Sequence, residues 1–205
     1  MLQTPKVALC CESVIVGEEE CFIQNLLEWY CPSGAQMRLL YRGTRDGMEP
    51  AAFHRLCDDQ GPTITIIKST NNQSIFGGYT TASWSGNGHK TCDNTSLFTL
   101  TKPQEEDFSM KFDCNPQFRS HAIIADPNRG PTFSGNELSI TGGIVDPSRG
   151  PIFIGNKISM TGGIGCWNTM NRFKAVGPHA LVGQPFGLPI QRQFAVAEIE
   201  VFTVS

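Results

Sequence analysis

The chain has 205 residues, of which 40% are hydrophobic and 17% are charged, and its formal net charge is −3. This length predicts a single domain, residues 1–205, that can bury a sizeable core. The sixteen Lys and Arg residues are scattered singly, so no basic stripe exists to bind phosphates, and nucleic acid is not an expected partner. No apolar run approaches the roughly 18 residues of a membrane-spanning helix, so we expect no direct membrane insertion.

The cysteine content bears on the cellular compartment. The chain has eight cysteines, Cys10, Cys11, Cys21, Cys31, Cys57, Cys92, Cys114 and Cys166. An even number would suit a disulfide framework in a small secreted domain. This chain is larger, and its beginning has neither the apolar core nor the small-residue cleavage site of a signal peptide. We therefore expect an intracellular, cytosolic protein with reduced thiols.

The first predicted element is a helix over residues 18–31. Phe22, Leu26 and Tyr30 recur every four residues and form an apolar stripe. Three glutamates at its start favour the positive end of the helix dipole, and Pro32 ends it.

A strand, a turn, a helix and a second strand follow. Residues 38–43 predict the first strand, and residues 44–47 predict a polar turn. Pro50 suits the first turn of a short helix that runs to about Cys57. Isoleucine alternates with threonine in residues 63–68, which predicts the second strand.

Residues 74–84 predict a strand that is interrupted at Gly77-Gly78. This pair indicates a bulge or a close approach of two backbones. Residues 85–95 then predict a polar loop, and residues 97–100 predict another strand.

Residues 126–145 and 146–165 form a tandem repeat that matches at 13 of 20 positions. Each copy predicts a β-hairpin with Gly-Asn as its two-residue loop. Two copies are too few for a solenoid, which needs about three, so a duplicated hairpin within one sandwich is the simpler interpretation. Residues 194–204 have the composition of a buried terminal strand.

The Gly-Asn pairs also predict the register of both hairpins. If they are the tips, Phe133 lies opposite Leu138, and Phe153 lies opposite Ile158. The many strands and few helices together predict a strand-dominated α+β fold.

The sequence contains no recognisable catalytic or metal-binding motif. CxxC, HExxH and GxSxG are absent, and the Gly-rich segment before Lys90-Thr91 does not match a phosphate loop. We therefore expect no metal, no cofactor and no enzymatic activity. His54 and Cys57 share a helix face by their spacing, but packing or capping is the simpler role for His54.

A redox-sensing thiol should be exposed and held as a thiolate by nearby positive charge. Cys57 precedes two aspartates, which disfavour the thiolate. Cys92 lies between Lys90 and Asp93 in the predicted polar loop and is the most accessible candidate. A thiol-based antioxidant that acts directly through cysteine is therefore one possible function.

Several separate motifs occur in a characteristic order. They are LLYRGTRDG (39–47), FHRLCDDQGPT (53–63), IFGGYT (75–80), Trp84 and AEIEVF (197–202). In this order they resemble the TLDc domain, the module of TBC and LysM proteins that is also found in oxidation-resistance proteins. The resemblance covers residues 7–204, and the doubled hairpin departs from the single unit of the family pattern. It implies a β-sandwich flanked by a few short helices, with no established catalytic residues.

The resemblance also implies a partner and a set of residues. TLDc proteins contribute to oxidative-stress resistance, and several bind the vacuolar proton-pumping ATPase (V-ATPase), so we expect subunits of this pump as partners and as the route to organelle membranes. The matching motif residues are Arg42, Arg45, Asp46, Gly47, Asp58, Gly61, Pro62, Gly77, Gly78, Trp84, Glu198 and Glu200. The glycines and the proline are expected to shape turns, and Trp84 to pack. Arg45, Asp46, Glu198 and Glu200 are the candidates for partner contact, with internal salt bridges and caps as their alternative role.

Overall fold

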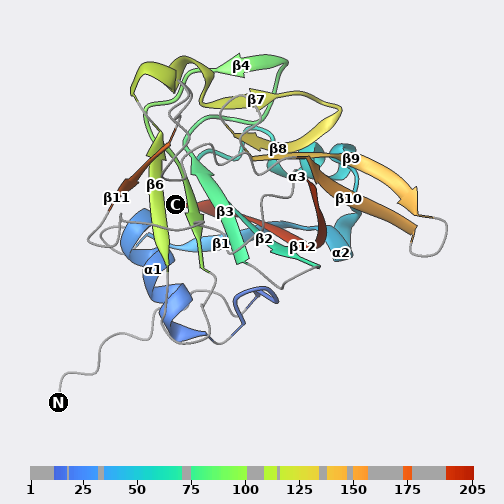
Figure 1. The fold of residues 1–205 in the computed structure, drawn as a ribbon, viewed down its shortest axis with the longest axis horizontal. Coiled ribbons are helices and arrows are strands. Elements are labelled where there is room, and N and C mark those ends of the chain that lie inside the picture. The colour runs from blue at the N-terminus through green and yellow to red at the C-terminus, as the bar shows by residue number, and fades with distance from the viewer. Residues whose placement is uncertain are drawn as a thin grey trace.

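A computed structural model describes residues 12–17, 19–31, 35–70, 75–100, 109–114, 116–133, 138–146, 150–156, 173–176 and 193–205. Its elements in chain order are α1 (Glu20–Tyr30), β1 (Met37–Arg42), α2 (Gly43–Asp46), α3 (Pro50–Cys57), β2 (Thr63–Ser69), β3 (Ile75–Thr80), β4 (Gly88–Lys90), β5 (Thr95–Thr99), β6 (Met110–Cys114), the 3-10 helix η2 (Pro116–His121), β7 (Ile123–Ala125), β8 (Arg129–Phe133), β9 (Leu138–Asp146), β10 (Gly150–Asn156), β11 (Phe173–Val176) and β12 (Gln193–Val204). Strands dominate this part of the chain and its helices are short, so the predicted α+β class is confirmed (Figure 1).

Two antiparallel sheets share the long strand β12. The first sheet has the order β11-β6-β5-β3-β2-β12-β1, and the second continues from β12 through β10-β9-β8-β7-β4. The start of β12, residues 193–195, pairs with β10. Residues 196–203 pair with β2, and residues 200–204 pair with β1 on the opposite edge. The predicted terminal strand is therefore confirmed, and it connects the two sheets (Figure 1).

One hydrophobic cluster lies between the two sheets. It includes Ile67 of the first sheet, Phe133 of the second sheet and Phe53 of α3. Trp84 joins them, since its ring meets those of Phe53 and Phe133 edge-on at 5.5 and 5.3 Å. Its buried Nε1 donates a hydrogen bond of 2.9 Å to Thr63 Oγ1, so the indole has the polar partner that burial requires. The predicted packing of Trp84 is confirmed.

A second cluster lies between the other face of the first sheet and α1. It combines the predicted helix stripe, Phe22, Leu26 and Tyr30, with side chains such as Ile66 of β2. Successive side chains of a strand point to opposite faces, so Ile66 and its neighbour Ile67 belong to different clusters. Strand β2 is therefore buried on both faces.

Strand β3 runs without interruption, contrary to the predicted break. It pairs continuously with β2 and β5. A Cβ atom at Gly77 would overlap the carbonyl oxygen of Thr65, and one at Gly78 would lie 2.6 Å from the Phe133 ring. The two glycines thus permit a close approach, which was one of the two predicted alternatives, and they form no bulge.

Two predicted polar segments contain regular structure. Residues 44–47 were expected as a turn, but α2 forms a single helical turn there, closed by a hydrogen bond of 3.0 Å from Gly47 N to Gly43 O. Residues 85–95 were expected as a loop, but residues 88–90 form β4 and pair with β7. Pairing with a distant strand, rather than local hydrophobic alternation, makes β4 a strand, and the local sequence could not indicate this.

The tandem repeat forms consecutive strands of the second sheet. In the first copy, β8 and β9 pair with Phe133 opposite Leu138, as predicted. The second copy begins at Asp146, the last residue of β9, which pairs with Gly150 of β10. Strand β10 then lies between β9 and β12. Ile158, the predicted partner of Phe153, lies outside the described residues.

His54 links α3 to the second sheet. Its Nδ1 lies 2.7 Å from Asp58 Oδ1, and its Nε2 lies 2.9 Å from the carbonyl oxygens of both Asp126 and Arg129. Both ring nitrogens therefore lie within hydrogen-bond distance of oxygen atoms. His54 also packs edge-on against Phe53, so the predicted structural role, packing or capping, is confirmed, and Asp58 serves the same link.

None of the described helices is long and apolar enough to cross a membrane.

Candidate functional site

Arg45 and Asp46 lie on α2, which directly follows β1. Two nitrogens of the Arg45 guanidinium donate to the Asp46 carboxylate, at 2.9 and 2.8 Å. Asp46 also accepts a hydrogen bond of 2.9 Å from the backbone N–H of Arg42. The Arg45 hydrogen bonds, with that of Arg42, lower the pKa of Asp46 against the opposing effect of burial. The Arg45 side chain is 46% exposed, so this candidate can contact a partner.

Glu200 lies in the interior, with none of its surface exposed. Its Oε1 accepts hydrogen bonds from Arg42 Nε at 2.8 Å and from Val14 N at 2.9 Å. Its Oε2 accepts one of 2.6 Å from the Ser13 hydroxyl. The structure thus gives Glu200 the internal salt-bridge role, and burial removes it from the residues that a partner could touch.

Glu198 is also buried, at 7% exposure. Its carboxylate accepts hydrogen bonds from both the backbone N–H and the hydroxyl of Thr44, and from the N–H of Ile199. It therefore holds the first turn of α2 against β12 and has the capping role. Of the four predicted contact residues, Arg45 is exposed and Asp46 is partly exposed, while Glu198 and Glu200 are buried.

Cys92 is buried rather than accessible, since only 6% of it is exposed. The backbone N–H of Cys92 donates a hydrogen bond of 3.0 Å to the carbonyl oxygen of Arg119, which holds Cys92 against η2. The prediction of exposure, which was based on its polar sequence neighbours, is therefore wrong. Burial raises the pKa of the Cys92 thiol, but hydrogen bonds with Thr81, Thr95 and Thr80 outweigh this effect and lower it overall.

The other cysteines with perturbed acidity are less suited to redox chemistry. Burial raises the pKa of the Cys31 thiol to about 11. Burial, followed by the negative charges of Asp58 and Asp46, raises the pKa of Cys57 well above its usual range. Such thiols stay protonated and react slowly with oxidants.

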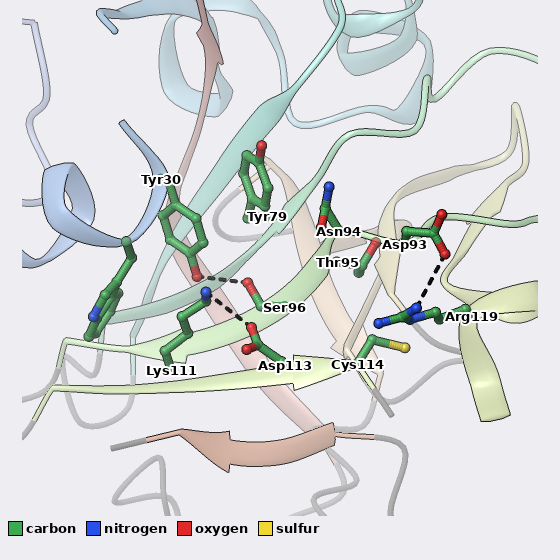
Figure 2. Close-up of a pocket in the computed structure, with 11 residues that line it drawn as sticks. Tyr30, Tyr79, Asp93, Asn94, Thr95, Ser96, Lys111, Asp113, Cys114 and Arg119 are labelled. Carbon is green, nitrogen blue, oxygen red and sulfur yellow. Dashed lines mark hydrogen bonds and ion pairs between the residues drawn. The ribbon is translucent and has the colours of Figure 1, made fainter. Parts of the chain in front are cut away.

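A cavity of about 310 Å³ opens beside the C-terminal end of α1. It is lined by residues of α1, β3, β5, β6, η2 and the loop before β5, namely Trp29, Tyr30, Tyr79, Asp93, Asn94, Thr95, Ser96, Lys111, Asp113, Cys114 and Arg119 (Figure 2). None of these residues was predicted as a site. They come from separate parts of the chain, so only the sheet pairings bring them together.

Aromatic rings and hydroxyls form one wall of this cavity. Tyr30 stacks on Tyr79 with ring centroids 4.6 Å apart, and its hydroxyl lies 2.9 Å from the Ser96 hydroxyl (Figure 2). Burial raises the pKa of Tyr30 well above its usual range, although the Ser96 hydrogen bond opposes the rise. Tyr30 therefore stays neutral and can both donate and accept a hydrogen bond.

Two ion pairs lie at opposite ends of the cavity (Figure 2). Lys111 Nζ lies 3.1 Å from Asp113 Oδ1, and 5.4 Å from the centre of the Tyr30 ring. Arg119 Nη1 lies 3.4 Å from Asp93 Oδ1. The cavity thus combines basic, acidic, hydroxyl and aromatic groups. Among the described residues, no group of three or more His, Cys, Asp or Glu side chains is placed to hold a metal ion.

Comparison with protein families tests the resemblance seen in the motifs. The model of the TLDc domain matches residues 12–205. This chain belongs to the TLDc domain family. A comparison with curated proteins finds no match. The matched range includes every described element, so β12, α2 and the cavity are all parts of this TLDc domain.

Proposed function

We propose that this TLDc domain is a non-catalytic protein-interaction module that binds the V-ATPase and thereby contributes to oxidative-stress resistance. Membership of the family supports the proposal, because several TLDc proteins bind this pump. In this proposal the protein works in the cytosol and reaches organelle membranes through its partner.

The exposed Arg45 side chain is the best starting point for locating the contact surface. It is held by the bidentate pair with Asp46, so little conformational freedom would be lost when a partner binds. Arginine is enriched among the residues that dominate binding energies in protein interfaces.

Co-sedimentation with V-ATPase-containing membranes tests the proposal. Wild-type protein at micromolar concentration should co-sediment with the pump and alter its ATP hydrolysis. Arg45→Gln should weaken co-sedimentation by about tenfold, the effect of losing about 1.4 kcal/mol, if Arg45 is one of the few residues that dominate the binding energy. Arg38→Gln is the matched control, since Arg38 is an exposed arginine on β1. If wild-type protein neither sediments with the pump nor changes its ATP hydrolysis, the proposal is wrong.

The alternative of direct thiol chemistry has one observation in its favour, the lowered pKa of Cys92. Its burial opposes the alternative, because an oxidant must reach the sulfur. A folded variant with all eight cysteines replaced by Ser or Ala would decide between the two functions. Protection that survives in this variant would eliminate thiol chemistry, and protection that disappears while pump binding persists would support it.

A further inference from the structure

In the cavity beside α1, the basic side chains are less exposed to solvent than the acidic side chains that pair with them. At one end Lys111 is 23% exposed and its partner Asp113 is 48% exposed. At the other end Arg119 is 41% exposed and its partner Asp93 is 80% exposed. Both acidic side chains are therefore more exposed to solvent than the basic side chains that pair with them. Lys111 and Arg119 both line the cavity, so a ligand that enters it meets their hydrogen-bond donors.

Arg119 has unused donor capacity. Among the described residues, its guanidinium makes one hydrogen bond, the long contact of 3.4 Å from Nη1 to Asp93. Its Nε is buried and has no hydrogen-bond partner in the part of the chain that the structure describes. A buried donor without a partner is unfavourable, by about 1–3 kcal/mol. An acceptor that draws the guanidinium further into the cavity would relieve this cost.

We propose that the cavity binds a single carboxylate, supplied by an Asp or Glu side chain of a protein partner. Arg119 would donate from Nε and a terminal nitrogen in the bidentate geometry that arginine forms with carboxylates, and Lys111 would add a second positive charge. The Ser96 hydroxyl offers a further donor, and the half-buried Tyr79 ring can pack against the methylene groups of the ligand.

The size and charge of the cavity select a carboxylate over other anions. About 310 Å³ is at the lower end of the range for ligand pockets, roughly 300–1,000 Å³, and accommodates one or two side chains. Asp93 and Asp113 remain nearby. They would repel a doubly charged phosphate more strongly than a singly charged carboxylate.

This inference rests on the proposed function, because it takes the ligand to be part of a protein. It adds the chemistry that the partner must present, which is an acidic side chain on an accessible segment. The expected affinity of one such side chain alone is low, because the chain has a net charge of −3 and does not attract anions over long distances.

NMR titration of ¹⁵N-labelled protein tests the inference, with the Arg119 Nε–H resonance as the reporter. The probes are the peptide acetyl-Ala-Glu-Ala-amide, the same peptide with Gln in place of Glu, and inorganic phosphate. The Glu peptide should shift the Arg119 Nε–H signal in a saturable way, and added salt should weaken this binding. Equal shifts with the Gln peptide, tighter binding of phosphate, or no shift with any probe would each overturn the carboxylate assignment.

Variants identify the groups responsible. In the Arg119 variants, which lack the Nε–H reporter, binding is followed by the backbone amide signal of Ser96, which lines the cavity. Arg119→Gln should weaken binding of the Glu peptide by about tenfold, and Arg119→Lys should restore only part of it because lysine lacks the bidentate fork. Arg55→Gln is the matched control, since Arg55 is an exposed arginine on α3 and does not line the cavity. Lys111→Gln provides an independent second test. Wild-type affinity in both Arg119→Gln and Lys111→Gln would overturn the inference.

The two proposals fail in distinguishable ways. If the protein sediments with the pump but no Glu peptide shifts Arg119, the cavity inference is wrong and the proposed function stands. If the Glu peptide binds in the cavity but the protein never sediments with the pump, the choice of partner is wrong and the cavity inference stands.

Discussion

Replacement of Glu200 by alanine should destabilise the protein severely. The carboxylate is fully buried and accepts hydrogen bonds from Arg42 Nε, the Val14 N–H and the Ser13 hydroxyl. Its removal leaves three donors without an acceptor, and one of them is a guanidinium that is only 17% exposed. Loss of one member of a buried ion pair costs about 3–5 kcal/mol. For a chain of this size each kcal/mol lowers Tm by about 2–4 °C, so Tm should fall by roughly 6–20 °C.

Urea unfolding followed by tryptophan fluorescence measures this change. Glu200→Gln is the matched variant, because its amide oxygen can still accept from Arg42 and Val14 while the negative charge is lost. It should cost less, about 1–3 kcal/mol. A free energy of unfolding within about 1 kcal/mol of wild type for Glu200→Ala would refute the reasoning. Equal losses in both variants would show that the charge, rather than the hydrogen-bond geometry, stabilises this region.

Three further predictions concern other parts of the fold. His54→Leu removes the link between α3 and the second sheet and should lower the free energy of unfolding by about 1–3 kcal/mol in urea titrations, whereas an unchanged midpoint would contradict the link. Gly78→Ala should cost about 1–3 kcal/mol because the new methyl group meets the Phe133 ring, and Phe133→Leu should recover part of that loss in the double variant. Asp46→Asn tests the lowered pKa of Asp46. The folded state favours the carboxylate form, so the charge stabilises the fold above the unfolded pKa of about 3.9. This stabilisation is lost as the pH falls through the lower pKa of the folded state. Wild type should therefore be more stable than the variant at pH 7, and acid titration of both proteins should remove the difference.

Short sequence patterns correctly predicted two helices and one hairpin, because these elements are formed by residues that are near neighbours in the chain. The apolar stripe of Phe22, Leu26 and Tyr30 correctly indicated α1, and Pro50 marked the start of α3. The Gly-Asn pair of the first repeat gave the correct register of Phe133. In each case the signal lies within a few residues, because helices and tight hairpins are formed by near neighbours in sequence.

The roles of the acidic residues in β12 could not be predicted in this way. Glu198 and Glu200 alternate with apolar residues, which is the pattern of a strand with one face in water. However, β12 pairs with strands on both edges, and the regions around Glu198 and Glu200 are covered by α2 and by residues 13–14. The residues that cover Glu198 and Glu200 lie more than 150 positions away in the chain; the Glu198–Thr44 hydrogen bond, for example, spans 154 positions.

The cavity was unpredictable for a related reason. Trp29, Tyr79, Ser96, Lys111 and Arg119 have no shared motif, and each fits an ordinary structural role in its own segment. Only the pairing of β5 with β3 and β6, and the position of η2, place them around one space. Cys92 illustrates the same limit, because the carbonyl that buries it belongs to Arg119.

The position of β12 has a consequence for the way this protein is made. The ribosome synthesises β12 after every other described strand, yet β1, β2 and β10 all pair with it. A nascent chain that has not yet emerged beyond residue 193 therefore exposes unpaired edges in both sheets, and such edges favour aggregation. Completion of both sheets must wait for the same late segment. The protein should consequently depend on chaperones during translation, and a ribosome that stalls before residue 193 should yield a product that is degraded rather than partly functional.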